Sequence, residues 1–340
     1  MKHKIMLLYT GGTIGMMHNS VTNALEPFPF SDIYAHLPML HLLDAEIIYK
    51  ELEPLIDSSD TNPAFWLRLA KEIASCYDEV DGFVILHGTD TMAYTASALS
   101  FLLENLSKPV ILTGSQLPLG VMRTDGRENI LNSVEIAIAQ LNGRSRVPEV
   151  CIYFEDSLYR GNRAYKDNAE QFNAFTSSNY PKLAEVGVKI KYNDTYIHQP
   201  NGRQLVLHTR MDDNIGILKL YPGITSRLIS TILKTPSIRA IIMETYGAGN
   251  APTDPVFLSL LKEAVEQGIL IVNVTQCKGG GRVEAGLYGA SIALSEIGVI
   301  SGRDITTEAA IAKMMYLLGQ ELSNEEVKRQ MNVSLRGEMN

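Results

Sequence analysis

Short runs of β-branched and aliphatic residues alternate with amphipathic helical segments along most of the chain. This alternation is typical of βαβ units, and strands that are apolar on both faces indicate a parallel sheet covered by helices. In the first half of the chain the expected strands are residues 4–9, 45–49, 82–86, 110–113 and 150–154. The expected helices between them are residues 63–77, 92–103 and 130–141.

The chain has 340 residues, which is more than a single domain usually holds. From residue 156 to about residue 213 it becomes polar and weakly periodic, and a second series of strands and helices follows. We therefore predict two doubly wound, flavodoxin-like α/β domains, the N-terminal one being the larger. The expected boundaries are 1–190 for the N-terminal domain, 191–213 for a linker and 214–340 for the C-terminal domain.

Composition excludes several classes of partner. The 38 acidic residues outnumber the 30 Lys and Arg residues and give a formal net charge of -8, which disfavours nucleic acid or an anionic membrane as the main partner. Three scattered cysteines and seven histidines without an HExxH pattern predict neither a disulfide framework nor a metal site. The N-terminal apolar run ends at Thr10-Gly11-Gly12, and no later stretch could span a bilayer, so we expect a soluble, cytoplasmic protein.

Polar, hydroxyl-rich sequences directly follow the first four expected strands, at residues 9–15, 55–60, 87–91 and 114–116. The carboxyl ends of parallel strands share one edge of a sheet, so these four loops are expected to converge there. Turn and helix-cap preferences would explain any one such loop, because Gly, Ser, Thr and Asp are common at those positions. Four of them at one edge favour a functional site, and they make the N-terminal domain the expected catalytic domain.

The residue types in these loops indicate nucleophilic catalysis by a threonine. A hydroxyl needs a neighbouring base to become a good nucleophile, and a lysine with a lowered pKa can be that base. Lys166, expected in the loop after the fifth strand, can reach the same edge, and Asp90 can hold the lysine or bind a ligand ammonium. These considerations predict that Thr13 or Thr89 attacks, and they leave open which one.

The same loops are suited to a small zwitterion such as a free amino acid. The amides of residues 88–91 open a helix and can hold a carboxylate or a developing oxyanion, while Asp57 and Ser58 supply a carboxylate and a hydroxyl. The alternative from another class is a non-catalytic metabolite or nucleotide sensor that binds an anion at Gly11-Gly12. No GxGxxG or GxxxxGK[ST] fingerprint supports that alternative.

Two motifs, Tyr9-Thr10-Gly11-Gly12-Thr13-Ile14-Gly15 and Leu86-His87-Gly88-Thr89-Asp90-Thr91-Met92, resemble the two signatures of the bacterial-type L-asparaginase family. The similarity to the cytoplasmic type I branch extends through residues 56–60, 158–163, 246–252, 275–277 and 335–338. It implies a hydrolase that acts on a linear amide, converting asparagine to aspartate and ammonia without metal or organic cofactor. It also implies a homotetramer built from two tight dimers. A broader glutaminase-asparaginase is the alternative among enzymes.

The resemblance also implies roles for individual residues. Thr13 would attack the side-chain amide and form an acyl-enzyme, while Thr89, Asp90 and Lys166 would form a second hydroxyl, carboxylate and lysine group. The residues implied to hold or line the substrate are Asp57, Ser58, Ser59, Thr89, Asp90 and Ser115.

The chain departs from the family pattern in two places. Residues 16–30 contain no tyrosine, so the group that assists the first threonine is left open between Tyr34, Tyr288 and a water molecule. At a regulatory asparagine site found in some members, Glu244 stands where an arginine is expected and Tyr165 where a threonine is expected, although residues 275–277 remain. A glutamate repels an effector carboxylate, so activation by asparagine is expected to be weak or absent.

Overall fold

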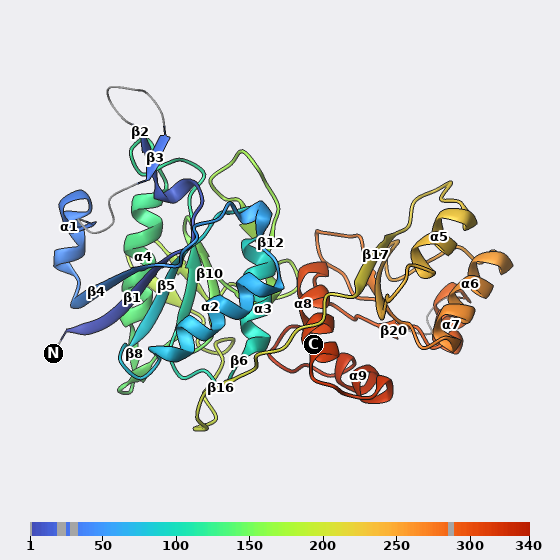
Figure 1. Cartoon of the computed structure of the whole chain (residues 1–340). Coiled ribbons are helices and arrows are strands. Elements are labelled where there is room, and N and C mark those ends of the chain that lie inside the picture. The colour runs from blue at the N-terminus through green and yellow to red at the C-terminus, as the bar shows by residue number, and fades with distance from the viewer. Residues whose placement is uncertain (1, 19–24, 28–32, 285–288) are drawn as a thin grey trace. The chain divides into compact units, whose positions relative to one another are not determined.

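The computed structural model describes residues 2–18, 25–27, 33–284 and 289–340. The chain forms two compact units, residues 1–209 and residues 210–340, which we call the N-terminal and C-terminal units (Figure 1). The expected linker, residues 191–213, spans this division. Its first residues end a strand of the N-terminal sheet, and residues 206–207 form another short strand of the same unit.

The N-terminal unit is built on an eight-stranded sheet whose parallel part has the order β4-β1-β5-β7-β10. These strands are β1 (His3–Tyr9), β4 (Ala45–Glu51), β5 (Gly82–Leu86), β7 (Val110–Thr113) and β10 (Val150–Phe154). Every residue of β5, β7 and β10 is buried, as expected for apolar strands covered on both faces. The order is 2-1-3-4-5 in chain sequence, so the flavodoxin-like arrangement and all five expected strands are confirmed.

Three long helices connect these strands: α2 (Pro63–Ser75), α3 (Met92–Leu102) and α4 (Gly126–Ile138). Asn62 caps α2 by accepting a hydrogen bond from the Phe65 N–H at 3.1 Å, and Pro63 occupies the first helical position, where no amide donor is needed. Ten of the eleven residues of α3 are buried, and this helix lies directly after the candidate loop 87–91.

The segment after β10 differs from the sequence expectation. Instead of an open loop, residues 157–160 form β11 (Ser157–Arg160), which returns antiparallel to β10. Lys166 therefore lies on a separate two-residue strand, β12 (Tyr165–Lys166), which pairs with β13 (Phe175–Thr176). Residues 157–160 lack the continuous apolar run that marks β7, and a two-residue strand is too short to give a periodic signal in a sequence.

The N-terminal unit also has shorter elements. They are η1 (Thr13–Gly15), β2 (Met16–His18), β3 (Leu25–Pro27), α1 (Ile33–His36), η3 (Pro38–Leu42), η4 (Ser58–Asp60), β6 (Leu103–Glu104), β8 (Gln140–Leu141), β9 (Arg144–Ser145), η5 (Gly161–Arg163), β14 (Ala184–Val186), β15 (Ile190–Tyr192) and β16 (Val206–Leu207). Of these, β14 and β15 extend the eight-stranded sheet beyond β11.

The C-terminal unit has a sheet of four parallel strands in chain order: β17 (Ile215–Lys219), β18 (Ala240–Thr245), β19 (Leu270–Thr275) and β20 (Ile300–Ser301). Its helices are α5 (Ser226–Leu233), α6 (Pro255–Glu266), α7 (Gly289–Ile297), α8 (Thr307–Gly319) and α9 (Asn324–Met331). The strand order does not reverse, so this sheet has no switch point of the kind that forms a ligand crevice.

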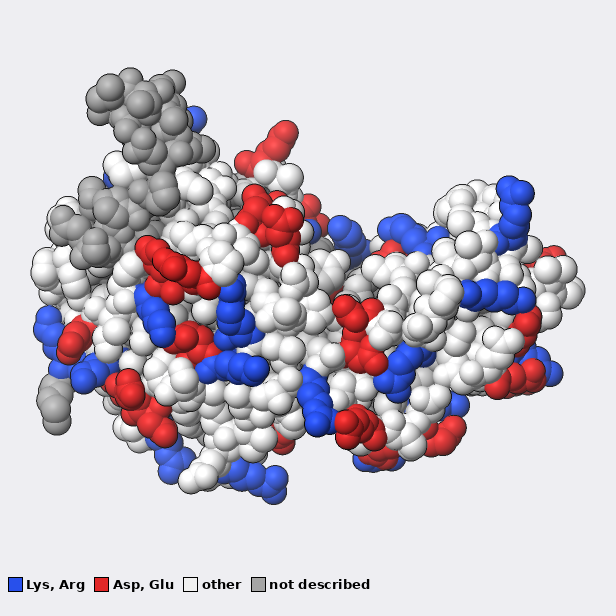
Figure 2. Space-filling view, in the orientation of Figure 1, with Lys and Arg blue, Asp and Glu red and all other residues white. Residues whose placement is uncertain are grey.

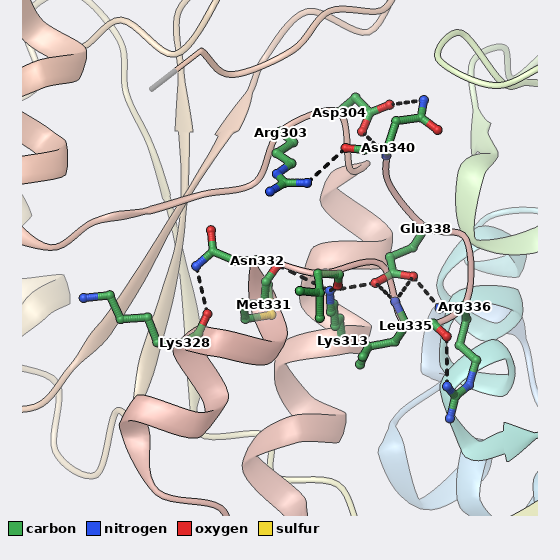
Figure 3. Close-up of polar contacts among 11 residues, drawn as sticks. Arg303, Asp304, Lys313, Lys328, Met331, Asn332, Leu335, Arg336, Glu338 and Asn340 are labelled. Atoms are coloured by element: carbon green, nitrogen blue, oxygen red, sulfur yellow. Dashed lines mark hydrogen bonds and ion pairs between the residues drawn. The ribbon is translucent and has the colours of Figure 1, made fainter. Parts of the chain in front are cut away.

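The end of the chain is fastened to the C-terminal unit by a buried ion pair (Figure 3). The Lys313 ammonium on α8 lies 2.6 Å from a Glu338 carboxylate oxygen, and both side chains are fully buried. Lys313 also donates to the Val333 carbonyl oxygen at 2.6 Å and to that of Met331 at 3.3 Å. The three donors of the ammonium therefore all have acceptors, which is the condition for burying such a charge.

Acidic and basic side chains are interspersed on the face drawn in Figure 2. Such mixing gives no broad basic surface there for a phosphate backbone. Within the described ranges, no helix is long and apolar enough to cross a membrane.

Candidate active site

Glycines bring the four loops into contact at the carboxyl edge of the N-terminal sheet. A Cβ atom on Gly12 would lie 2.6 Å from the Cα of Gly88, and a Cβ on Gly88 would lie 2.5 Å from the Ser58 hydroxyl. A Cβ on Gly114 would lie 2.4 Å from the His87 carbonyl oxygen. Approaches this close are open only to residues without a side chain. The predicted convergence of the loops after β1, β4, β5 and β7 is therefore present.

Hydrogen bonds between side chain and backbone tie two of these loops together. The Thr91 hydroxyl donates to the Ser58 carbonyl oxygen at 2.6 Å and lies 2.8 Å from the Thr61 hydroxyl, which reaches the same carbonyl at 2.9 Å. The start of α3 is thus fixed to η4. This arrangement holds the loop that carries Thr89 and Asp90 against the loop that carries Asp57.

Lys166 joins Thr89 and Asp90 into one cluster. Its ammonium donates to the Thr89 hydroxyl at 2.7 Å and to an Asp90 carboxylate oxygen at 2.7 Å. The lysine side chain is only 17% exposed, whereas that of Asp90 is 66% exposed. The sequence predicted this association although Lys166 is more than 70 positions from the other two residues, and the geometry brings the three together.

Asp57 is fixed by Ser59 and has one oxygen without a bond among the described residues. One carboxylate oxygen accepts from the Ser59 N–H at 2.9 Å and from the Ser59 hydroxyl at 2.8 Å. These two bonds, the backbone one first, lower the pKa of Asp57. The carboxylate therefore remains ionised, with its second oxygen available to a ligand ammonium.

Thr13 is exposed at the start of η1, directly after the glycine that contacts Gly88. Beneath this turn the ring of Tyr9 is buried against Gly15, and its hydroxyl lies 3.4 Å from the Gly12 carbonyl oxygen. Among the described residues, no group is hydrogen-bonded to the Thr13 hydroxyl. The structure thus brings the loop of Thr13 to the site, but the Thr13 hydroxyl is not hydrogen-bonded to the Lys166 cluster.

Two of the expected substrate-contacting serines are buried. Ser58 lies beneath Gly88, and the Ser115 hydroxyl donates to the Leu117 carbonyl oxygen at 2.6 Å. The loop of Ser115 is in turn held by Asp125, which accepts from the backbone N–H groups of Gln116 and Leu117. Substrate contact by these serines stays a prediction.

His87 is a residue that the sequence reasoning missed, although it lies inside the second motif. One ring nitrogen, Nδ1, lies 2.6 Å from the Gly88 carbonyl oxygen, and the other, Nε2, lies 3.0 Å from the Thr95 hydroxyl. The Trp66 indole N–H donates to the same hydroxyl at 3.0 Å. Burial lowers the pKa of His87 to about 4, so the ring is neutral at neutral pH. Its position inside the second motif was the only signal in the sequence.

The assistant to Thr13 is not identified by these contacts. Tyr34 is occupied elsewhere, since its hydroxyl accepts from the Ile47 N–H at 3.1 Å and its ring stacks on His41. Tyr288 lies outside the described residues. In the part of the chain that the structure describes, no three His, Cys, Asp or Glu side chains gather in a way that could hold a metal ion.

The flavodoxin-like sheet, with hydroxyl, lysine and carboxylate groups at its carboxyl edge, defines a two-unit α/β protein whose site fits an amide hydrolase. Two family models match the chain: "Asparaginase, N-terminal" over residues 4–198 and "Glutaminase/Asparaginase C-terminal domain" over residues 214–331. The chain therefore belongs to the asparaginase family.

Individual relatives agree with this assignment. The chain is 43% identical over 339 residues to "L-asparaginase 1" of Escherichia coli K12, covering 99% of this chain and 98% of that protein. It is 44% identical to the crystal structure of L-asparaginase I from Vibrio cholerae, with a TM-score of 0.91 and complete coverage of both chains. It is also 42% identical over 361 residues to the mouse "60 kDa lysophospholipase", covering 99% of this chain and 63% of that protein.

Proposed function

We propose that this chain is an L-asparagine amidohydrolase, which converts asparagine to aspartate and ammonia. The observation that carries the proposal is the Lys166 ammonium bonded at 2.7 Å both to the Thr89 hydroxyl and to the Asp90 carboxylate, at the edge where the Thr13 loop meets Gly88. The names of the Escherichia coli and Vibrio cholerae relatives support it.

The reaction proceeds in two steps. The Thr13 oxygen bonds to the carbon of the side-chain amide, the carbon–nitrogen bond breaks, and ammonia leaves with the proton from the hydroxyl. Water then bonds to the acyl carbon, the ester bond to Thr13 breaks, and the threonine regains its proton as aspartate is released. Thr89 and Lys166 form the relay that takes the proton from the water, and Asp90 holds the lysine.

The groups around the two threonines bind the amino acid itself. Asp57 and Asp90 accept from the α-ammonium, because each has one oxygen engaged within the protein and one left over. Ser58 and Ser59 complete the site for the α-carboxylate, and Ser115 lines the amide pocket. No metal or organic cofactor takes part, and extended dialysis against a chelator is expected to leave the activity unchanged.

A Thr13→Ala variant tests the proposal directly. We expect ammonia release from asparagine to fall at least ~10³-fold, because the variant lacks the hydroxyl to which the proposal assigns the acyl-enzyme. The melting temperature should change little, since Thr13 is exposed and makes no hydrogen bond to the described residues. Hydrolysis at the original rate would overturn the nucleophile assignment, and a wild-type protein that binds asparagine without releasing ammonia would overturn the proposed function.

A broader glutaminase-asparaginase is the second candidate, and the family model named "Glutaminase/Asparaginase C-terminal domain" favours testing it. Asparagine and glutamine differ by one methylene group, and a binding pocket can use one methylene to favour one substrate over the other by only ~1–3 kcal/mol of free energy. Ammonia release from the two amino acids at matched low concentrations separates the candidates. A kcat/KM ratio near one would establish the broader activity.

We propose that the chemistry belongs to an N-terminal catalytic domain, expected at residues 1–190 and continuing to residue 209 in the structure. Of the expected linker, residues 191–213, only the last four belong to the C-terminal unit, whose expected domain is residues 214–340. We further propose a cytoplasmic homo-oligomer, a dimer or a tetramer, in line with the type I branch that the motifs resemble. Light scattering on the purified protein measures the oligomeric mass. A monomeric mass at micromolar concentration would contradict the oligomer.

A further inference from the structure

His87 lies behind the candidate site and has no access to solvent, since it is only 1% exposed. Its hydrogen bonds define which ring nitrogen carries the proton. The Gly88 carbonyl oxygen can only accept, so the ring nitrogen next to it, Nδ1, must carry a proton. The Thr95 oxygen accepts from the Trp66 indole, which can only donate, and the Thr95 hydroxyl is left to donate to His87 Nε2. Because the buried ring is neutral, Nε2 accepts and Nδ1 carries the proton, which it donates to the Gly88 carbonyl oxygen.

This bond fixes the orientation of the peptide group between Gly88 and Thr89. The peptide is trans, so its C=O and N–H point in opposite directions. With the Gly88 oxygen directed to the buried ring, the Thr89 N–H points away from that ring. Among the described residues, no group accepts a hydrogen bond from it, so it is available to an oxygen of a bound ligand.

The crowding around Gly88 explains why this orientation matters for the whole site. Gly12 and Ser58 from two other loops lie against the Gly88 backbone, and Gly114 lies against the His87 carbonyl. Rotation of the 88–89 peptide would displace the Thr89 amide and also disturb the contacts of these neighbours. A tautomer change at His87 would remove the donor that opposes such rotation.

We propose that His87 is a positioning residue, which acts as the Nδ1–H tautomer to orient the Gly88–Thr89 peptide so that the Thr89 N–H donates to the substrate oxygen that gains charge in the transition state. The inference rests on the proposed function for the identity of that oxygen. Thr95 and Trp66 contribute by fixing the tautomer.

Two substitutions separate positioning from packing. In His87→Asn the amide nitrogen takes the place of Nδ1 and can still donate to Gly88, whereas in His87→Gln it takes the place of Nε2 and cannot. We expect kcat to fall ~30-fold or more in His87→Gln, with KM changed less than ~3-fold, and to stay within ~10-fold of wild type in His87→Asn. Packing alone predicts the reverse order, because glutamine fills the volume of histidine better than asparagine does.

Ser97→Ala is the matched control. Ser97 is a fully buried residue of the same helix as Thr95, and its hydroxyl has no hydrogen-bond partner among the described residues. Its kcat and KM should equal those of wild type. Equal kcat values in His87→Asn and His87→Gln, or a higher value in His87→Gln, would overturn the proposal.

A second measurement is independent of turnover and is made on the wild-type protein, with a variant used only to assign the signal. Nitrogen-15 spectra of wild-type protein with labelled histidine report the tautomer and protonation of each ring, and the His87 signal is the one that His87→Asn removes. We expect a neutral ring protonated on Nδ1 at pH 6, and a neutral ring protonated on Nε2 would overturn the proposal. If the wild type does not hydrolyse asparagine, the proposed function fails. The tautomer measured in the spectra still tests whether His87 donates to the Gly88 carbonyl oxygen.

Discussion

The Lys166 cluster consists of Lys166, Thr89 and Asp90, and its two charged side chains differ in exposure. The lysine is mostly covered while its aspartate partner is open to solvent. A covered amine that donates to a hydroxyl is arranged to move a proton along that bond. The exposed aspartate accepts from the lysine with one oxygen, and its other oxygen has no bond to the residues that the structure describes.

Replacing Lys166 with methionine removes the amine to which we assign the proton relay and keeps an unbranched side chain of similar length. We expect kcat for asparagine to fall by ~10² to 10⁴, because general acid–base catalysis contributes on that scale. Lys182→Met is the control, since Lys182 forms an exposed ion pair with Glu185 in the same unit. Steady-state kinetics should show a large loss only in the first variant, and an unchanged kcat in Lys166→Met would contradict the role of the lysine.

The buried ring of His87 also predicts how stability depends on pH. The pKa is lowered to about 4 in the folded protein from 6.5, so between these values the unfolded chain binds more protons. Unfolding is then favoured as the pH falls from 6.5 toward 4, and this residue contributes up to about 3 kcal/mol of the loss. Urea denaturation at pH 7 and pH 5 measures the free energy of unfolding. This free energy should decrease less between the two pH values in His87→Asn than in wild type, and an equal decrease would contradict the lowered pKa of His87.

At the scale of elements, the site depends on loops whose backbones touch. Gly88 marks the point of contact, and its missing side chain is what allows Ser58 and Gly12 to approach. Thr91 and Thr61 add hydrogen bonds between the same loops. The ends of the strands thus determine where the loops begin, and the contacts between the loops fix the positions of their side chains.

A Gly88→Ala variant is expected to displace η4 from the start of α3, because the added Cβ would lie 2.5 Å from the Ser58 hydroxyl and 2.7 Å from its Cβ. We expect kcat/KM to fall ~10²-fold, since small misplacements of catalytic groups have effects of that size. Gly187→Ala is the control, because nothing lies within 4 Å of a Cβ there. A variant at Gly88 with wild-type kinetics would show that the contact is dispensable.

The sequence was sufficient for the regular elements and insufficient for the irregular ones. The five parallel strands and the helices 63–75 and 92–102 carry continuous apolar runs or periodic faces, which predict structure directly. The hairpin at 157–160 and the strand at 165–166 depend on contacts distant in the chain, so no local pattern reports them.

The candidate site was predictable where strand ends determine position. Lys166 was expected near Thr89 and Asp90, and the distances confirm that association. His87 was missed because a histidine followed by glycine has many structural explanations, and only the three-dimensional network with Thr95 and Trp66 distinguishes them.

At the scale of the whole molecule, the C-terminal unit is stabilised by the buried ion pair between Lys313 and Glu338. Burial alone would raise the pKa of Glu338, but the Lys313 ammonium and the N–H groups of Leu335 and Arg336 together lower it. The last residue is also bound, since the Asn340 N–H donates to Asp304 at 2.8 Å (Figure 3). Glu338 and Met339 are therefore buried in the unit, although Asn340 itself is exposed.

Glu338→Gln is expected to destabilise the C-terminal unit by about 3–5 kcal/mol, because it leaves a buried ammonium without its counter-charge. Glu266→Gln, which breaks an exposed pair with Lys262, should cost less than about 1 kcal/mol. Thermal unfolding monitored by circular dichroism compares the two. Equal melting temperatures would show that the buried pair contributes no more than a surface pair.

Regulation by asparagine is expected to be weak or absent in this chain. Glu244 accepts from the Thr307 hydroxyl at 2.8 Å and pairs with Lys219 at 3.2 Å, and the Tyr165 hydroxyl lies 2.7 Å from that of Ser178. These groups therefore have partners within the protein and offer no cation to an effector carboxylate. Initial rates should follow a hyperbola in asparagine concentration, and a sigmoidal curve abolished by substituting Glu244 would contradict this.

The interlocked glycines at Gly12, Gly88 and Gly114 have a consequence for engineering this scaffold. A single loop grafted from a homologue would clash with neighbouring loops whose backbones fit the original loop. Altered selectivity is therefore more readily reached by transplanting all four segments as a set, with the histidine beneath them, than by exchanging one at a time.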